Sequence, residues 1–296
     1  MTQQNPSRPD SVLESGGSAV RFVKTADLTW HVQISGAGPT LLLVHGTGAS
    51  IHSWRKLVPM LASRFTVVVP DLPGHGKSSN ECDACLSLPG MSKVLARLLE
   101  ALAVKPALVV GHSAGAAVLI RMCLDGTIAP AAVVSINGAL MPFNGFAGQI
   151  FAPLAKLLVL NPFVPRFLAW RAQDRRAVER LLRGTGSELD SEGIDLYAEL
   201  FRNPEHVAAT LGMMANWDLE PLSETIKNLK IPLILVAAEG DKTIAPEDAK
   251  DVAALVPAAR VVALPDLGHL AHEERPDTVE ELILRVAQEH GVIPSL

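Results

Sequence analysis

One serine of the chain lies in a G-x-S-x-G motif, GHSAG at residues 111–115. The apolar run Ala107–Val110 precedes this motif, and the helical pattern Ala114–Leu124 follows it. A turn between a strand and a helix presents the serine hydroxyl at a sharp bend, and its glycines let the backbone pass close to neighbouring elements. The motif by itself occurs by chance, but this setting predicts that Ser113 is a nucleophile.

A serine hydroxyl is a weak nucleophile, so this prediction requires a base and an acid that holds the base in place. Asp241 follows the apolar run Pro232–Ala237 through a short turn, and His269 follows the last apolar run, Arg260–Leu264. The order serine, acid, histidine along the chain is one of the known orders of such triads. We therefore expect His269 to be the base and Asp241 its orienting acid.

Other interpretations of these residues stay open from the sequence. Asp241 is also a suitable turn or helix-capping residue. His272 competes with His269, although His269 directly follows a glycine after a predicted strand, whereas His272 falls where a helix or turn begins. His45 and His112 are expected to form hydrogen bonds within the loops and the core.

Attack of a serine on a carbonyl creates an oxyanion, which needs preorganised hydrogen-bond donors. The backbone N–H of Ala114, next to the nucleophile, is the first expected donor. The second is assigned to the N–H of Thr47, in the segment HGTG at residues 45–48 after the apolar run Thr40–Val44. A glycine-rich turn also binds phosphate, but neither this segment nor DLPGHGKS at residues 71–78 has the spacing of a Walker A motif.

The elements that position these residues are short apolar runs that alternate with amphipathic helices. The runs are uninterrupted in hydrophobicity, which is typical of strands buried on both faces of a parallel sheet. The predicted strands are Trp30–Ile34, Thr40–Val44, Phe65–Val69, Ala107–Val110, Ala131–Ile136, Pro232–Ala237 and Arg260–Leu264. Helical spacing of apolar residues occurs in segments 54–61, 94–102 and 276–291. This alternation predicts an α/β fold with a mostly parallel central sheet flanked by helices.

The pattern changes in residues 139–222, which show helical segments broken by prolines and no convincing strand. Such a block predicts a helical cap inserted over the carboxyl edge of the sheet, where open α/β sheets bind ligands. The expected organisation is a mobile leader over residues 1–18, a core formed by residues 19–138 and 223–296, and the cap between the two core segments.

Aromatic and methionine side chains gather in the predicted cap. Most of them are expected to bury the cap against itself and the core, and a subset to line an apolar pocket above Ser113. The candidates for this lining are Phe143, Met214 and Trp217. The charged run DRRAVERLLR at residues 174–183 is expected to be a solvated helix face, and its arginines are alternatively contacts for propionate groups or a protein partner.

Composition excludes several classes of function. A net charge of −5 argues against nucleic acid as a partner, because phosphate binding needs a basic face. Three cysteines are too few for a disulfide framework and for a zinc site, so Cys82 and Cys85 are expected to be two loop thiols in a reducing compartment. No signal peptide, membrane-spanning run or metal-ligand spacing is found, which predicts a cytoplasmic protein without a metal or cofactor.

Several motifs together resemble a known family. HGTGAS, DLPGHGKS, GHSAG, the EGD turn and LGHLAHEE are similar to motifs of the α/β-hydrolase family, across nearly the whole chain beyond the leader. The cap segments NGALMPFNGFAG, NPFVPR, RLLRGTGS and MMANWDL, with the tail LGHLAHEERP, resemble the magnesium-chelatase accessory hydrolases of bacteriochlorophyll biosynthesis, the BchO type. The second resemblance is the more specific one, because cap segments are not general motifs of the fold.

The predicted triad favours a serine hydrolase that acts through an acyl-enzyme, and the apolar cap favours a hydrophobic ester, while carbon–carbon bond hydrolysis, peroxidative chemistry and amide hydrolysis stay open. The resemblance implies an α/β-hydrolase fold and a role in bacteriochlorophyll biosynthesis. The implied substrate is a hydrophobic small molecule, with a tetrapyrrole as one candidate. The alternative is a non-catalytic accessory protein that binds a tetrapyrrole intermediate or a magnesium-chelatase subunit. An apolar cap surface would also allow peripheral contact with a membrane.

Overall fold

The computed structural model describes residues 11–14, 18–142, 161 and 163–294, and its centre is a nine-stranded sheet. The strands are β1 (Ser11–Glu14), β2 (Ser18–Lys24), β3 (Thr29–Ser35), β4 (Thr40–Val44), β5 (Thr66–Pro70), β6 (Leu108–His112), β7 (Val133–Ile136), β8 (Leu233–Ala238) and β9 (Ala259–Leu264). Their order is β1-β2-β3-β5-β4-β6-β7-β8-β9, with the first three antiparallel and the other six parallel. The prediction of a mostly parallel sheet is confirmed.

All seven predicted strands are present, with ends that differ from the prediction by at most two residues. Strands β1 and β2 were not predicted, and β1 lies within the stretch 1–18 that was expected to be a mobile leader. Strand β2 extends the sheet beyond the helices that cover its faces, and its Phe22 is exposed. A strand in this position does not need to be apolar throughout, and its sequence, SAVRFVK, mixes polar and apolar residues. The criterion of uninterrupted hydrophobicity therefore could not detect it.

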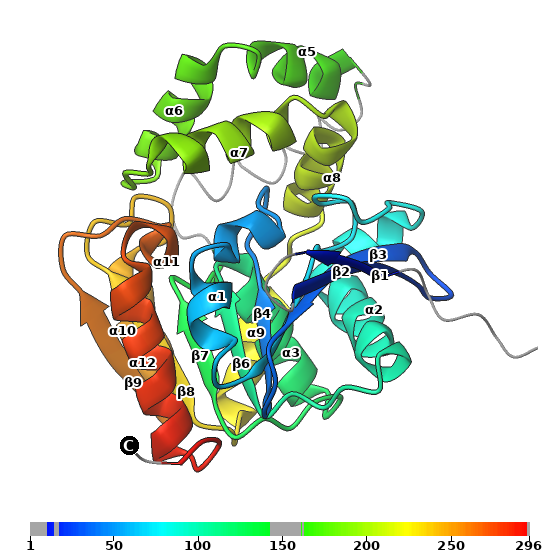
Figure 1. Ribbon diagram of the computed structural model, residues 1–296. Helices are drawn as coiled ribbons and strands as arrows, with labels where there is room; N and C mark the ends of the chain where they lie inside the picture. The colour runs from blue at the N-terminus through cyan, green and yellow to red at the C-terminus, as the bar shows by residue number, and fades with distance from the viewer. Residues whose placement is uncertain (1–10, 15–17, 143–160, 162, 295–296) are drawn as a thin grey trace, which may run out of the picture.

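Helices cover both faces of the parallel strands, which is why β6, β7 and β8 are buried along their whole length (Figure 1). One face packs on α1 (Leu57–Leu61) and α12 (Pro276–Glu289). The other face packs on α2 (Leu88–Ala101), α3 (Ala114–Leu124) and α10 (Pro246–Leu255). Strand β9 is half exposed, because it is the edge of the sheet.

A helical cap lies above the carboxyl ends of the parallel strands, between β7 and β8 in sequence (Figure 1). Its described helices are α5 (Phe163–Arg171), α6 (Arg175–Gly184), α7 (Ser191–Phe201) and α8 (Pro204–Ala215), and the chain returns to the sheet through α9 (Glu220–Thr225) and the 3₁₀ helix η3 (Ile226–Asn228). The predicted inserted cap is confirmed.

Capping side chains set the starts of the cap helices. Asp174, Asp190 and Asn203 each accept a hydrogen bond from an N–H in the first turn of α6, α7 and α8. These residue types satisfy the N–H groups that a helix leaves without partners at its beginning. Among the helices that the structure describes, none is long and apolar enough to cross a membrane.

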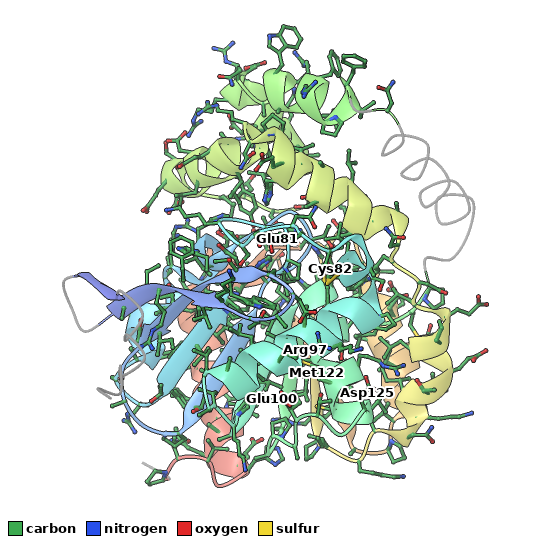
Figure 2. All side chains as sticks on the ribbon, turned by 90° about the vertical axis from the view of Figure 1, so that its right-hand side faces the viewer. Glu81, Cys82, Arg97, Glu100, Met122 and Asp125 are labelled. Carbon is green, nitrogen blue, oxygen red and sulfur yellow. A yellow bond between two sulfur atoms is a disulfide. The ribbon has the colours of Figure 1, made fainter. Side chains whose placement is uncertain are left out.

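Cys82 and Cys85 form a disulfide, so the prediction of two loop thiols is wrong (Figure 2). The intervening residues begin the short 3₁₀ helix η2 (Asp83–Leu86), and this turn brings the two Cα atoms to 5.3 Å. That separation lies within the range that a disulfide bridges. The third cysteine, Cys123, is a free thiol on α3, and burial raises its pKa to about 12.

Candidate active site

Ser113 lies at the sharp turn between β6 and α3, with φ 51° and ψ −120°. A positive φ is costly for a residue with a Cβ atom and persists only where the surroundings fix it. Here the Ser113 N–H donates to the Ile136 carbonyl at 3.0 Å, and the Ser113 carbonyl accepts from the N–H groups of Ala116 and Ala139 at 3.1 Å each. Strand β7 and its following loop thus hold the serine backbone on both sides.

The two glycines of the motif are required by close backbone approaches. A Cβ atom on Gly115 would lie 2.3 Å from the Val44 carbonyl oxygen of β4, and one on Gly111 would lie 2.4 Å from the Ala116 nitrogen. Both separations are far below van der Waals contact. The GHSAG sequence therefore allows α3 to begin directly against the end of β4.

Asp241 and His269 form the hydrogen bond that the sequence predicted to exist between acid and base. His269 Nδ1 lies 2.7 Å from Asp241 Oδ2, and both side chains are buried. The second carboxylate oxygen, Oδ1, accepts from the N–H groups of Thr243 at 2.7 Å and Ile244 at 3.0 Å. With Nδ1 donating to the carboxylate, Nε2 is the ring nitrogen that can accept a proton.

The competing histidine, His272, has none of these contacts. It is the second residue of α11 (Ala271–Glu274). Its side chain is fully buried, and its ring packs at a tilt against the rings of Trp54 and His112. Neither of its ring nitrogens has a partner among the described residues. Burial lowers the pKa of His272 to about 3, so it stays neutral. Of the two histidines, the structure gives the carboxylate partner to His269.

His112 and His45 form structural hydrogen bonds, as predicted. His112 Nε2 donates to the His269 carbonyl at 2.9 Å, and the two rings lie 4.7 Å apart, which places the residue next to Ser113 against the histidine loop. Burial lowers the pKa of His112 well below its usual range, so it remains a neutral donor. His45 Nε2 accepts from the Leu72 N–H at 2.9 Å. No group of His, Cys and carboxylate side chains in the described parts of the chain could hold a metal ion.

Asn137, which was not predicted, joins the nucleophile side of the site to the histidine side. It follows β7 with φ 45°, and its Nδ2 donates to the carbonyls of Gly268 at 3.1 Å and His269 at 2.9 Å. Its Oδ1 accepts from the Ala238 N–H at 2.8 Å. Asparagine is one of the few residues with a side chain that adopts a positive φ readily. An asparagine directly after a predicted strand and before a glycine was the available signal.

Residues 185–188 of the cap, which we call the strap, bind both loops of the acid and the base. The Thr185 carbonyl accepts from the N–H groups of Lys242 at 3.1 Å and His269 at 3.3 Å. Ser187 Oγ accepts from the Leu270 N–H at 2.8 Å, and Ser187 is buried. The N–H groups of His269 and Leu270 are therefore held by the cap, whereas the His269 carbonyl is held from the sheet side by Asn137 and His112.

The strap packs closely against the loops of Asp241 and His269, through glycines and a carboxylate. A Cβ atom on Gly186 would lie 2.0 Å from the Gly240 carbonyl oxygen, and one on Gly268 would lie 2.3 Å from Gly186 backbone atoms. The Glu274 carboxylate accepts from the N–H groups of Gly268 at 3.0 Å and Glu188 at 3.1 Å. Three chain segments thus meet with no room for side chains between them.

A buried ion pair makes a second connection between the cap and the histidine loop. Tyr197 of α7 donates to Glu273 Oε1 at 2.8 Å, and Arg55 donates to Glu273 Oε2 at 2.5 Å. Arg55 also pairs with Asp190 at 3.1 Å, at the start of α7. Burial raises the pKa of Glu273 to about 7, against the opposing effects of Arg55 and Tyr197.

The segment HGTG lies against Ser113, the predicted nucleophile. A Cβ atom on Gly46 would be 2.9 Å from Ser113 Cβ, so the chain around Thr47 passes directly beside the serine. Thr47 Oγ1 donates to Met213 Sδ at 3.5 Å, which brings α8 of the cap onto this segment. The N–H groups of Thr47 and Ala114 donate to no other residue in the described parts of the chain. Both N–H groups are thus available to an acceptor bound at Ser113.

The three pocket candidates have different surroundings. Phe143 lies outside the described residues. Met214 is half-buried on α8, where its neighbour Met213, which was not predicted, makes the contact with Thr47. Trp217 is half-buried after α8 and packs against the core cluster below α2 and α3. The described contacts therefore place Met213 of the cap beside Thr47, which carries one of the expected oxyanion donors.

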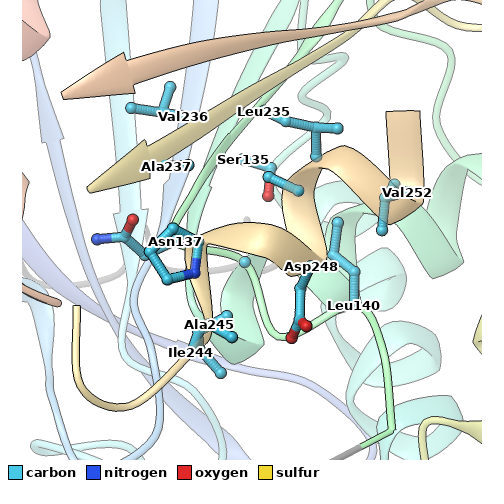
Figure 3. A pocket seen from close by; sticks show the side chains of 13 residues that line it. Ser135, Asn137, Leu140, Leu235, Val236, Ala237, Ile244, Ala245, Asp248 and Val252 are labelled. Atoms are coloured by element: carbon cyan, nitrogen blue, oxygen red, sulfur yellow. The ribbon is translucent and has the colours of Figure 1, made fainter. Parts of the chain in front are cut away.

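A small cavity lies behind the loop that carries Asp241 (Figure 3). Its walls come from the ends of β7 and β8, from the segment after Asp241 and from α10, and they include Ser135, Asn137, Ile244 and Asp248. Its volume of about 20 Å³ is room for about one water molecule. This cavity is too small for a substrate and belongs to the support of the acid loop.

Comparison with known proteins adds sequence and structural relatives. The sequence matches the α/β hydrolase family over residues 41–282. It is 39% identical to a magnesium-chelatase 30 kDa subunit of Rhodobacter capsulatus, over 90% of this chain and 94% of that protein. It is 30% identical to a pyrrolizixenacetamide deacetylase of Xenorhabdus hominickii, over 88% and 94% of the two chains. The structure matches an α/β hydrolase fold protein of Burkholderia ambifaria with a TM-score of 0.76 and 22% identity, over 94% and 100% of the two chains. Both resemblances seen in the sequence motifs are confirmed.

Proposed function

Since the chain belongs to the α/β hydrolase family, we propose that it is a serine hydrolase that acts through an acyl-enzyme on a hydrophobic carboxylic ester. The observation that carries the proposal is the buried 2.7 Å hydrogen bond between His269 and Asp241. This pair is joined through His112 and Asn137 to the strained turn of Ser113. The three residue types and their roles are those of a catalytic triad.

In this mechanism Ser113 Oγ attacks the ester carbonyl while His269 Nε2 takes the hydroxyl proton. Asp241 holds Nδ1–H and stabilises the imidazolium that forms. The oxyanion accepts hydrogen bonds from the N–H groups of Thr47 and Ala114, the latter at the N-terminus of α3, where the helix dipole favours negative charge. His269 returns the proton to the leaving alcohol, and a water molecule then releases the acyl group by the same steps in reverse.

The substrate class follows from the cap and from the relatives. The chain is similar along nearly its whole length to a protein named as a magnesium-chelatase subunit, and that similarity includes the cap. We therefore assign the reaction to bacteriochlorophyll biosynthesis, with an ester of a magnesium tetrapyrrole as the candidate substrate. Phe143, Met214 and Trp217 are the proposed apolar lining, since a tetrapyrrole ring needs a mostly apolar pocket.

The name of this relative also supports a second candidate function, a non-catalytic accessory protein that binds a tetrapyrrole intermediate or a chelatase subunit. Such a protein has no need of a serine in a strained conformation or of a buried His–Asp pair. The cost of a backbone outlier, roughly 1–3 kcal/mol, favours the catalytic function, because strain of this kind is concentrated at active sites.

A fluorophosphonate probe distinguishes the two candidates, because it labels activated serines and not binding proteins. We expect stoichiometric labelling of Ser113 in the native protein and none in Ser113→Ala. Ser63→Ala, at an exposed serine outside the site, is the control and keeps full labelling. If the native protein is not labelled and does not cleave p-nitrophenyl esters, the hydrolase proposal fails and the binding function replaces it.

Titration with magnesium protoporphyrin and its methyl ester tests the substrate class separately. Binding over the cap should quench tryptophan fluorescence and compete with p-nitrophenyl ester hydrolysis, and Trp217→Ala should weaken both effects. If neither quenching nor competition occurs up to the solubility limit, the tetrapyrrole substrate is excluded, while probe labelling of Ser113 would still support the hydrolase.

A further inference from the structure

Helix α5 carries its side chains in an arrangement opposite to that of an ordinary surface helix. Its small residues Pro165 and Ala169 are buried, and Ala169 packs against Val207 and Leu211 on the cap side. Its large aromatic residues point outward instead: Phe163 is 71% exposed, Phe167 57% and Trp170 64%. A surface helix normally buries its large apolar side chains against the core.

These aromatic side chains form one stripe, because they are spaced at i, i+4 and i+7 along the helix. The rings of Phe167 and Trp170 lie 5.9 Å apart. Of the eight exposed large apolar residues among the described ones, five belong to α5 and α6, namely Phe163, Phe167, Leu168, Trp170 and Leu181. An apolar surface that is concentrated in this way marks an interaction site rather than scattered exposure.

The same two helices concentrate positive charge. Residues 163–184 hold six arginines and two carboxylates, a balance of +4 in a chain whose net charge is −5, so the rest of the sequence totals −9. Arg166 and Arg171 flank the aromatic stripe on α5, and Arg176 follows at the start of α6. These three are exposed and have no carboxylate partner among the described residues.

We propose that α5 and α6 form a docking surface for an anionic lipid bilayer. Aromatic side chains lie favourably at the level of lipid headgroups, and arginines bind the phosphates of those headgroups. Among the described elements, the two helices are the outermost of the cap, at the opposite end from the C-terminus (Figure 1), so a flat surface reaches them before the other described helices and strands. The excess of arginine selects an anionic bilayer over a neutral one, and this function is independent of hydrolysis at Ser113.

Co-sedimentation with lipid vesicles tests the proposal on the full-length chain. We expect binding to phosphatidylcholine vesicles that contain about one quarter phosphatidylglycerol, much weaker binding to phosphatidylcholine, and release by about 0.5 M salt. Trp170 should report binding by a blue shift of fluorescence, since Trp30 and Trp54 are already fully buried. Trp170→Phe should remove most of that shift while sedimentation persists.

Matched variants distinguish binding through α5 and α6 from non-specific binding of the protein to vesicles. Phe167→Ser combined with Trp170→Ser, and Arg166→Glu combined with Arg171→Glu, should each weaken vesicle binding by at least about tenfold, with unchanged p-nitrophenyl ester hydrolysis in solution. The controls are Leu255→Ser, at an exposed apolar residue of the core, and Arg64→Glu combined with Arg285→Glu, at exposed arginines far from α5. If the native protein does not bind anionic vesicles, or if the controls lose binding equally, the bilayer is excluded and the surface is left to a protein partner.

Discussion

Ser113, the proposed nucleophile, and His269, the proposed base, rely on different sets of contacts. Ser113 is fixed by the sheet itself, through hydrogen bonds to the end of β7 and the close approach of α3 to β4. His269 and Asp241 depend in addition on the inserted cap, because the strap binds the backbone of both loops, while Asn137 and His112 bind the His269 carbonyl from the sheet side. The cap therefore does more than cover a pocket: it sets the geometry of the proposed base. Substitutions around Ser113 should accordingly lower the stability of the fold, whereas substitutions around His269 should lower the turnover rate.

The largest effect is expected at the acid. Asp241→Asn should lower kcat for p-nitrophenyl esters by about 10³–10⁴-fold, because an amide no longer fixes the tautomer of His269. The fold should persist, since the amide oxygen can still accept from Thr243 and Ile244. Asp248→Asn, at a carboxylate on the small cavity behind the loop, is the control and should keep most of the activity. An unchanged rate for Asp241→Asn would assign the acid to another residue.

On the nucleophile side the expected loss is in stability. Gly115→Ala places a Cβ atom 2.3 Å from the Val44 carbonyl, so α3 must move away from β4. We expect thermal or urea unfolding to show a loss of about 3 kcal/mol or more, as for overpacking of a rigid core. Gly184→Ala is the matched control, because its Cβ atom meets nothing within 4 Å. Equal stability of the two variants would contradict the close approach at the elbow.

On the histidine side a smaller, kinetic effect is expected. Ser187→Ala removes the acceptor of the Leu270 N–H and loosens the loop of His269. We expect kcat to fall on the order of tenfold with little change in KM, because a displaced base costs turnover more than binding. The exposed Ser63→Ala should leave both constants unchanged. If Ser187→Ala behaves like Ser63→Ala in kcat, the strap does not position the base.

The smallest effect concerns the pH dependence of stability at the ion pair below the cap. Burial raises the pKa of Glu273 from 4.5 to about 7, so the folded protein binds this proton more tightly than the unfolded chain does. The contribution of Glu273 to stability is therefore lost as pH rises through that window. Glu273→Gln lacks this loss, so the Tm of the variant minus that of the wild type should increase from about pH 5 to about pH 8. For Glu281→Gln, at an exposed glutamate, this difference in Tm should stay constant with pH. A constant difference in Tm for Glu273→Gln as well would place the pKa of Glu273 in the ordinary range.

The difference between the two sides also explains how much could be predicted from sequence. Ser113, Asp241 and His269 follow predicted strands within a few residues, so local spacing identified them as candidates and also predicted the parallel sheet with its cap. Asn137 and the strap act through contacts with residues far away in the sequence; the position of Asn137 after a predicted strand and before a glycine was the one local signal, and the strap has none. Strand β2 mixes polar with apolar residues, and the bond between Cys82 and Cys85 depends on the local turn of η2. These features needed the three-dimensional structure.

The insertion of the cap between β7 and β8 also sets an order of assembly during synthesis. Domains fold from the N-terminal end as the chain emerges from the ribosome, so β4, β6 and the serine turn are available early. The side chain of Asn137 meets the carbonyl of His269 across 132 residues, so this contact forms only after that intervening chain has been made. A nascent or truncated chain that lacks residues 241–269 therefore carries the proposed nucleophile without its proposed base, and we expect Ser113 to become reactive only once these residues are in place.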